Sequence, residues 1–349
     1  MHGANGTNYW IKGNLLLLLQ DFLSNRFQSV RIASSISAPI LVTSGVPQGS
    51  VLGPLLFNLF INDITDNFTN ITAKLFADDI KLYTSISDLN SNSDFQHHLD
   101  LIYSWSYLWQ IPISYSKCSI LHLGPSTNKP TFNLDSVTLS DSTSIKDLGI
   151  LIDPSLKFTT HIHSLSKRAR QRSALIYRSF LSRNLSNLIL AYTTYVRPLL
   201  EYASPAWSPF QISLIDSFEK VQRSSTKRLP GMANLTYAQR LSITQLQSLE
   251  HRRLICDLTT CFNIVKGFSA IPLSAVFTPS PNLTSRGHPL RLLVPLSKSN
   301  IRHHFFACRI VKVWNSLPTA LVLASSTHTF KLLLSHHNLS PFLISPTIL

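Results

Sequence analysis

The sequence predicts an α+β fold, with short antiparallel strands and helices sharing the first 160 residues and helices dominating the remainder. Apolar and polar residues alternate on both sides of Asp78-Asp79, which is typical of a hairpin. Residues 94–110 and the stretch from His163 to Arg183 instead repeat apolar positions at helical spacing. With 44% hydrophobic and 14% charged residues, the chain can bury a core and is not disordered throughout.

The elements before the hairpin follow from apolar spacing and from glycine and proline. Residues 10–31 predict a helix to about Ser24 and then a strand over Phe27–Ile32. Leu15 to Leu19 indicates a buried helical turn, because five leucines are far too few for the ~20 residues of a membrane span. A turn at Gly45-Val46-Pro47 then opens an apolar helix from about Leu52 to Ile64, with Pro54 in its first turn, where a missing N–H costs little.

After the hairpin the pattern changes from mixed to helical. The expected elements are a helix over 94–110, a strand in the second half of 111–124, short strands over 132–160, and helices over His163–Arg183, Ser186–Arg197 and Ile212–Arg228. From about Ser269 the chain is rich in proline and serine, which predicts a linker.

Charge is distributed unevenly along the chain. Residues 1–100 carry 5 Lys/Arg against 8 Asp/Glu, whereas residues 101–349 carry 26 against 9. This asymmetry favours an acidic catalytic part and a basic part that holds a polyanion, although solubility alone would also explain a net charge of +14.

Cysteine and histidine usage excludes several classes of protein. Cys118, Cys256, Cys261 and Cys308 form no CxxC pair, so the sequence predicts neither a disulfide partner nor a zinc site. His303-His304 and His336-His337 have no cysteine at ligand spacing and are interpreted as surface residues. The N-terminus lacks a secretory pattern and no membrane span is indicated. The unpaired cysteines fit a reducing cell interior, and the sequence does not distinguish a nuclear from a cytoplasmic location.

Asp78 and Asp79 carry the chemistry that the sequence indicates. Two adjacent carboxylates repel each other, and each raises the other's pKa unless a cation lies between them. Mg²⁺, a hard cation with oxygen ligands, relieves that repulsion, and paired carboxylates holding two such ions form phosphoryl-transfer sites. An Asp-Asp pair alone is more often a solvated turn, but the apolar flanks predict a half-buried hairpin tip, where a metal role is more plausible.

The run from Gly45 to Asp63, GVPQGSVLGPLLFNLFIND, together with LFADDIKLY, resembles motifs B and C of the reverse transcriptase of non-LTR (LINE-type) retrotransposons of the jockey and CR1 kind. The strings YVRPLLEYASPAW and HHFFACRIVKVWNSLP also resemble this family. The resemblance implies a partial polymerase palm over 1–125, a palm–thumb connection over 126–160, a basic helical thumb over 161–268 and a C-terminal extension over 269–349. The implied partners are an RNA template, a DNA primer and deoxynucleoside triphosphates.

The resemblance also implies roles for particular residues. Asp78 and Asp79 would ligate two Mg²⁺ ions, and Lys117 would act as a general acid near the leaving pyrophosphate, although Ser114 and Ser116 replace asparagines that are common in the family. The other implied residues are, for template and nucleotide, Gly45, Pro47, Gln48 and Gly49, and, for nucleic-acid phosphates, Lys167, Arg168, Arg170, Arg172 and Arg178.

One part of the family pattern is expected to be missing. Motif A, Asp-x-x-x-Ala-Phe, would precede residues 10–31 and supply the aspartate that bridges both metals. Asp21 does not replace it, because it lies in the expected helix and Arg26 stands where the aromatic residue would be. The chain is therefore expected to be inactive by itself. Two alternatives stay open: a non-catalytic nucleic-acid-binding module and an unstable remnant with an exposed sheet edge.

Overall fold

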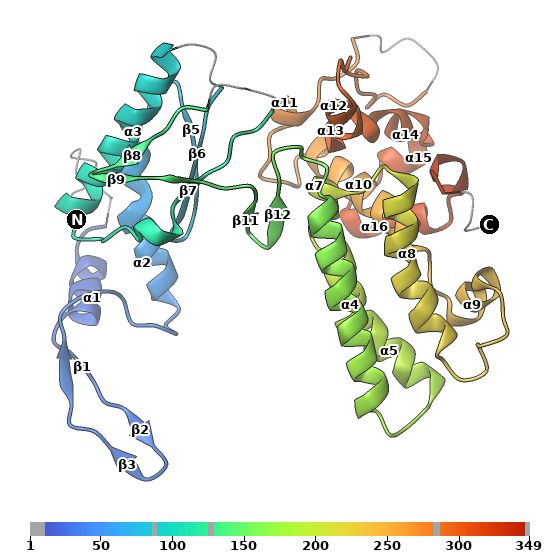
Figure 1. Cartoon of the computed structure of the whole chain (residues 1–349), viewed down its shortest axis with the longest axis horizontal. Helices are drawn as coiled ribbons and strands as arrows, with labels where there is room; N and C mark the ends of the chain where they lie inside the picture. The colour runs from blue at the N-terminus through green and yellow to red at the C-terminus, as the bar shows by residue number, and fades with distance from the viewer. Residues whose placement is uncertain (1–10, 86–88, 125–128, 282–286, 346–349) are drawn as a thin grey trace. The chain divides into compact units, whose positions relative to one another are not determined.

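The computed structural model describes residues 11–85, 89–124, 129–281 and 287–345 (Figure 1). The chain forms two compact units. The N-terminal unit comprises Met1–Ile120 and Thr127–Asp141, and the C-terminal unit comprises Leu121–Ser126 and Ser142–Leu349. Helices and small antiparallel sheets are mixed along the chain, which confirms the expected α+β class.

The N-terminal unit combines three helices with paired short strands. Its helices are α1 (Asn14–Leu23), α2 (Leu52–Ile61) and α3 (Leu89–Leu108), with 3-10 turns η1 (Asn62–Thr65) and η2 (Tyr115–Lys117). Its strands are β1 (Arg26–Gln28), β2 (Arg31–Ile32), β3 (Ser35–Ile36), β4 (Ile40–Val42), β5 (Thr72–Phe76), β6 (Asp79–Tyr83), β7 (Ser119–Ile120), β8 (Asn133–Leu134), β9 (Val137–Thr138) and β10 (Ser140–Asp141). The pairs are β1–β4, β2–β3, β5–β6, β8–β9 and the parallel pair β7–β10.

The core of this unit joins α2, α3 and the β5–β6 hairpin. Ile61, Ile64 and Trp105 are buried together, with Leu75 and Ile80 of the hairpin packed against them. The buried carboxylate of Asp63 accepts a hydrogen bond of 2.9 Å from the indole Nε1 of Trp105, so η1, which follows α2, is fixed to α3. A neighbouring cluster packs α3 against β8.

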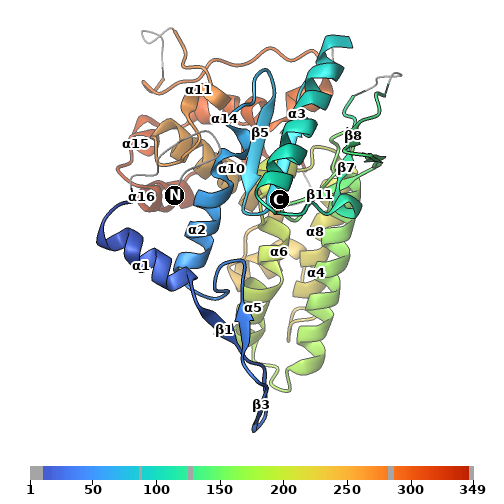
Figure 2. The same ribbon diagram turned by 90° about the vertical axis from the view of Figure 1, so that its left-hand side faces the viewer.

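Two expectations about the first 42 residues are wrong. The leucine run is not buried: Leu19 is the buried residue of α1, while Leu15, Leu17 and Leu18 are each more than half exposed. The strand expected over Phe27–Ile32 is divided into β1 and β2, and with β3 and β4 it forms a hairpin that extends away from α1 and α2 in both views (Figures 1 and 2). Its apolar side chains Phe27, Ile32, Ile36 and Ile40 are each more than half exposed.

The C-terminal unit is mainly helical. It begins with the antiparallel pair β11 (Ile145–Asp147) and β12 (Ile150–Ile152). Its helices are α4 (Thr159–Ser179), α5 (Leu185–Tyr195), α6 (Arg197–Glu201), α7 (Ser204–Trp207), α8 (Ile212–Lys227), α9 (Tyr237–Thr244), α10 (Leu249–Val265), α11 (Leu273–Val276), α12 (Asn300–His304), α13 (Phe306–Arg309), α14 (Val311–Ser316), α15 (Thr319–Val322) and α16 (Thr327–Ser335), followed by the 3-10 turn η3 (Ser340–Phe342).

The first of these helices starts four residues before the expected His163. The carboxylate of Asp153 accepts hydrogen bonds from the backbone N–H of Ser155 at 2.9 Å and of Phe158 at 3.1 Å. These bonds shape the turn that precedes α4, so the helix begins at Thr159. Helices α5 and α8 lie close to the expected spans, and α4, α5 and α8 pack side by side (Figures 1 and 2).

Two hydrophobic clusters hold the C-terminal unit together. One joins α4, α5, α6 and α8 through residues such as Ile162, Leu200 and Phe218, each fully buried. The other joins α10 to the last helices through Phe262, Trp314 and Phe330. Phe277 and Leu292 belong to this second cluster, so the stretch expected to be a linker is packed into the unit.

Among the described residues, no helix is both long and apolar enough to cross a membrane.

Candidate functional site

The two adjacent aspartates lie at the tip of the β5–β6 hairpin. In the antiparallel register Phe76 pairs with Asp79, which leaves Ala77 and Asp78 as a two-residue turn. Ala77 has φ of 51°, a conformation that costs a non-glycine residue free energy and keeps the turn tight. The expected hairpin and its position are therefore confirmed.

Burial differs between the strands and the tip of this hairpin. Leu75 and Ile80 face the core, whereas Asp78 and Asp79 are exposed, so the expectation of a half-buried tip is wrong for the carboxylates themselves. Side chains alternate along a strand, and this places Asp79 on the outer face of β6 together with Lys81. Within the described residues β5 and β6 pair only with each other, so each keeps an open edge.

The glycine-rich turn before α2 requires glycine for its backbone conformation. Gly45 has φ of 74° and Gly49 has φ of 80°, values that side-chain-bearing residues rarely adopt. A Cβ at either position would meet no atom within 4 Å, so the surrounding space is open. Between them Pro47 is partly buried and Gln48 is exposed. This arrangement leaves the backbone of the turn accessible to a ligand.

Three residues that sequence reasoning missed hold this turn in place. Arg26 donates from Nη2 to the carbonyl oxygens of Ser44, at 3.1 Å, and Gly45, at 2.7 Å, and from Nε to that of Leu23 at 2.9 Å. Ser50 Oγ donates to the carbonyl oxygen of Pro47 at 2.7 Å and accepts from the N–H of Gly53 at 3.0 Å. The signal for Arg26 was its place just after a helix end, where basic side chains bind free carbonyls.

Gly53 is the third of these residues. A Cβ on Gly53 would lie 2.9 Å from both the carbonyl oxygen of Pro47 and Oγ of Ser50. Glycine therefore permits the close approach between the turn and the first residues of α2. Because Phe57 and Ile61 of α2 pack in the core shared with the hairpin, α2 connects the glycine-rich turn to the strands that carry Asp78 and Asp79.

The remaining candidate residues are exposed. Lys117 ends η2 in the N-terminal unit, and its side chain is open to solvent. Asp21 lies in α1 and is exposed, as expected. The acidic pair and the glycine-rich turn are thus the two candidate features that a common core joins within the described part of the N-terminal unit.

The basic residues of α4 all lie on its outer surface. Leu165, Ala169 and Ile176 form the buried stripe that the sequence predicted, and the cations project from the other side. The exposed basic residues are Lys167, Arg168, Arg170, Arg172 and Arg178. Since α4 contains no acidic residue, its outer face is strongly positive and suited to phosphate contacts.

Helix α8 packs against the buried side of α4, opposite its basic face. Tyr177 of α4 donates from its hydroxyl to the carbonyl oxygen of Ser225 at 2.7 Å, and the guanidinium of Arg228 lies 4.7 Å from the centre of its ring. Burial raises the pKa of Tyr177 to about 12. The phenol therefore stays neutral and keeps its hydrogen bond, so the basic face of α4 has a rigid support.

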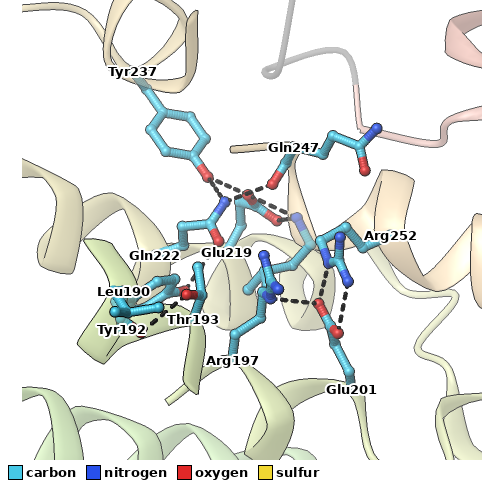
Figure 3. Close-up of polar contacts among 11 residues, drawn as sticks. Leu190, Tyr192, Thr193, Arg197, Glu201, Glu219, Gln222, Tyr237, Gln247 and Arg252 are labelled. Carbon is cyan, nitrogen blue, oxygen red and sulfur yellow. Dashed lines mark hydrogen bonds and ion pairs between the residues drawn. The ribbon is translucent and has the colours of Figure 1, made fainter. Parts of the chain in front are cut away.

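A buried polar network, which the sequence did not reveal, joins α5, α8, α9 and α10 (Figure 3). Glu219 is fully buried and accepts hydrogen bonds from the hydroxyl of Tyr237 and from the N–H of Leu249, at 3.0 Å to one oxygen. Gln222 connects Tyr192 and Tyr237, at 3.0 Å each. Burial raises the pKa of the Glu219 carboxyl, while the hydrogen bonds from Tyr237 and Leu249 oppose the shift.

Ion pairs complete the support of α10. Arg252 donates to both oxygens of Glu201, and Arg309 donates to both oxygens of Asp257 at 2.8 and 3.0 Å. Arg309 also donates to the carbonyl oxygen of Pro205 at 2.9 Å. These pairs join residues about fifty positions apart in the chain, and no local spacing in the sequence marks them.

Comparison with known proteins finds a family model that is similar to the first part of the chain. Residues 7–152 match the family model described as reverse transcriptase (RNA-dependent DNA polymerase). This range contains the glycine-rich turn, α2 and the hairpin that carries Asp78 and Asp79.

Several curated proteins are similar over a longer range. The probable RNA-directed DNA polymerase from transposon X-element of Drosophila melanogaster is 30% identical over 224 residues, which are 61% of this chain and 25% of that protein. The RNA-directed DNA polymerase from mobile element jockey of Drosophila funebris is 27% identical over 229 residues, 62% of this chain and 25% of that protein. The probable RNA-directed DNA polymerase from transposon BS of Drosophila melanogaster is 28% identical over 237 residues, which are 63% of this chain and 26% of that protein. The chain thus spans about a quarter of the length of these relatives.

Proposed function

Because residues 7–152 match the reverse transcriptase family, we propose that the chain is part of the RNA-directed DNA polymerase of a non-LTR retrotransposon. In this proposal residues 1–125 supply part of the palm, residues 126–160 connect it to the thumb, residues 161–268 supply the thumb, and residues 269–349 are a C-terminal extension. One observation carries the proposal. Asp78 and Asp79 lie on a hairpin that packs in the same hydrophobic core as α2, and α2 is the helix that directly follows the glycine-rich turn.

Asp78 and Asp79 are the residues that would hold Mg²⁺. Their carboxylate oxygens are the donor type that this ion prefers, and their exposure leaves room for it. When bound, such ions lower the pKa of an attacking hydroxyl and stabilise a leaving pyrophosphate. The donor number is too small for two ions, because the described residues contain no group of three or more His, Cys, Asp or Glu side chains placed to hold a metal.

The other proposed contacts follow from exposure and backbone shape. The open turn at Gly45, Pro47, Gln48 and Gly49 would lie against the template and the incoming deoxynucleoside triphosphate. Lys117 would donate a proton to the leaving pyrophosphate. The cations of α4 would bind phosphates of the template–primer duplex and position it without reading its sequence.

We further propose that the described residues do not polymerise DNA unaided. An open edge of the β5–β6 pair can accept another strand, and that strand would bring the third carboxylate. Primer extension with Mg²⁺ on an RNA template tests this proposal. We expect no processive product from the chain alone, and product when a polypeptide that carries Asp-x-x-x-Ala-Phe is joined to it. Processive synthesis by the chain alone would overturn the inactivity.

A second candidate is a nucleic-acid-binding protein without chemistry. It is favoured by the basic face of α4, which needs no metal to bind phosphates. Asp78→Ala separates the two candidates in the complemented protein. A polymerase loses extension while its duplex affinity is unchanged, whereas a binding protein shows no extension to lose.

A further inference from the structure

The last part of the chain contains no acidic residue. After Asp257 the sequence has 8 Lys/Arg and 6 His but no Asp or Glu up to Leu349. One of these cations, Arg309, is neutralised by Asp257. The exposed cations that follow Asp257 are therefore not screened by carboxylates from their own stretch of chain, which favours an anionic partner.

Helix α12 places aromatic rings among these cations. Phe305, which follows α12, is 44% exposed, and the guanidinium of Arg302 lies 5.2 Å from the centre of its ring. The ring of His304 stacks on that of Phe210, with centroids 3.9 Å apart and planes 2° apart. His303 and Lys298 are exposed beside them in the chain.

Arg309 stabilises the backbone near the stacked rings of His304 and Phe210. Arg309, fixed by Asp257, donates to the carbonyl oxygen of His304 at 3.0 Å and to that of Pro205 at 2.9 Å. These bonds join α12 to α7, and Phe210 lies three residues after the end of α7. The two rings are thus preorganised, which lowers the entropic cost of stacking another flat ring beside them.

We propose that this surface, formed by Phe210, Lys298, Arg302, His303, His304 and Phe305, binds single-stranded nucleic acid. Cations beside exposed aromatic faces bind a single strand by contacting its phosphates while the rings stack on its bases. An acidic peptide would use the cations but would leave the rings without a partner. The histidines do not form a metal site, because the described residues place no third metal-binding side chain near them.

The residues of this site belong neither to the acidic hairpin nor to α4, and the proposal does not depend on the proposed polymerase chemistry. It would hold a strand, of RNA or DNA, by contacts that do not read sequence. Unpaired bases offer faces for stacking and a duplex does not, so the site should prefer single strands.

Fluorescence anisotropy of the full-length chain with labelled 12-nucleotide probes, oligouridine and oligothymidine, tests the proposal, with a 12-base-pair duplex as comparison. Phe305→Leu should weaken single-strand binding about tenfold, the effect of losing one base stack, and Phe305→Trp should restore it. Arg302→Gln should weaken it as well and make its salt dependence shallower. Lys331→Gln, which removes an exposed cation from α16, should change it less than twofold.

The outcomes differ clearly between a site and no site. A loss with one or both single-stranded probes that exceeds the loss with duplex supports the site, and the probe that responds identifies RNA, DNA or both. Unchanged single-strand affinity in both Phe305→Leu and Arg302→Gln overturns it, as does an equal loss in Lys331→Gln or an equal loss for duplex. If the melting temperature of Phe305→Leu falls sharply, the test rests on Arg302→Gln. A loss of single-strand affinity in that variant that exceeds its loss of duplex affinity supports the site, and an unchanged single-strand affinity overturns it.

Discussion

The guanidinium of Arg26 donates a hydrogen bond of 2.7 Å to the carbonyl oxygen of Gly45. This contact spans nineteen positions and joins the end of α1 to the turn that precedes α2. The same side chain donates to the carbonyl oxygen of Leu23, the last residue of α1, at 2.9 Å. One arginine therefore binds both the C-terminus of α1 and the glycine-rich turn. The conformation of this turn therefore depends on a residue outside it.

Removing the Arg26 side chain should loosen the glycine-rich turn. We expect Arg26→Met, which keeps the approximate length of the side chain, to lower the free energy of unfolding by about 1–2 kcal/mol, because three hydrogen bonds from a charged donor to carbonyl oxygens are lost. Amide hydrogen exchange should rise over residues 44–53. The stability of Arg26→Lys should lie between that of the parent and that of Arg26→Met, because an ammonium group cannot reproduce the fork geometry of a guanidinium. Unchanged exchange in Arg26→Met would contradict this role.

Gly53 should not tolerate even a methyl group. Glycine to alanine inside a helix normally stabilises by about 0.5–1 kcal/mol, but here the Cβ would lie 2.9 Å from the carbonyl oxygen of Pro47. We expect Gly53→Ala to destabilise by about 1–3 kcal/mol through overpacking, measured by urea denaturation. Ser50→Ala in the same background removes one of the two clashing atoms, although it also removes the two hydrogen bonds of Ser50 Oγ. A Gly53→Ala variant more stable than the parent would show that the turn and α2 are not closely packed.

Local patterns allowed the hairpin and the longer helices to be predicted. Alternation around Asp78 predicted a hairpin with the two aspartates at its tip, and the spacing of Leu165, Ala169 and Ile176 predicted the buried side of α4. Glycine at positions 45 and 49 indicated a turn, which the positive φ angles confirm. In each case the pattern that allowed the prediction lies within a short, continuous segment of the sequence.

What could not be predicted depends on contacts between distant residues. The pair of Arg309 and Asp257 and the bonds of Glu219 to Tyr237 and Leu249 leave no periodic trace in the sequence. The exposure of the α1 leucines was also missed, because burial depends on whether another element covers them. Of the candidate site, residue types and local geometry were predictable, whereas the support supplied by Arg26 was not.

The buried carboxyl of Glu219 should make stability depend on pH. Burial raises its pKa in the folded state above the unfolded value, so its contribution is fully present below the unfolded pKa, near 4.5, and is lost as pH rises through the folded pKa. We expect the parent to lose stability relative to Glu219→Gln as pH rises from 4 to 8 in urea titrations.

Glu219→Ala should behave differently from Glu219→Gln. It leaves the hydroxyl of Tyr237 and the N–H of Leu249 without their buried acceptor, which should cost about 1–3 kcal/mol for each donor. Asp21→Asn, a change on the exposed face of α1, serves as the control and should leave the pH dependence of the parent intact. If Glu219→Gln and the parent keep a constant difference over this range, the carboxyl does not titrate differently on folding.

The outer face of α4 should determine duplex affinity. Replacing Arg168 and Arg172 together by glutamine removes two exposed cations without touching the buried stripe. If each contacts one phosphate, the slope of log affinity against log salt should become shallower by about two. Binding to a primer–template duplex at several salt concentrations measures this slope. Lys331→Gln, a cation on α16, should leave it unchanged, and an unchanged slope in the double variant would exclude α4 from the duplex contact.

The central claim is that Asp78 and Asp79 hold the metal of a nucleotide-transfer site. Primer extension on an RNA template by the chain joined to a polypeptide carrying Asp-x-x-x-Ala-Phe tests it directly, with Asp78→Asn and Asp79→Asn compared to the parent. The account predicts Mg²⁺-dependent extension in the parent and a loss of at least a thousandfold, about 4 kcal/mol, in each variant at unchanged duplex affinity. Extension by the Asp78→Asn and Asp79→Asn proteins at the parent rate would contradict it.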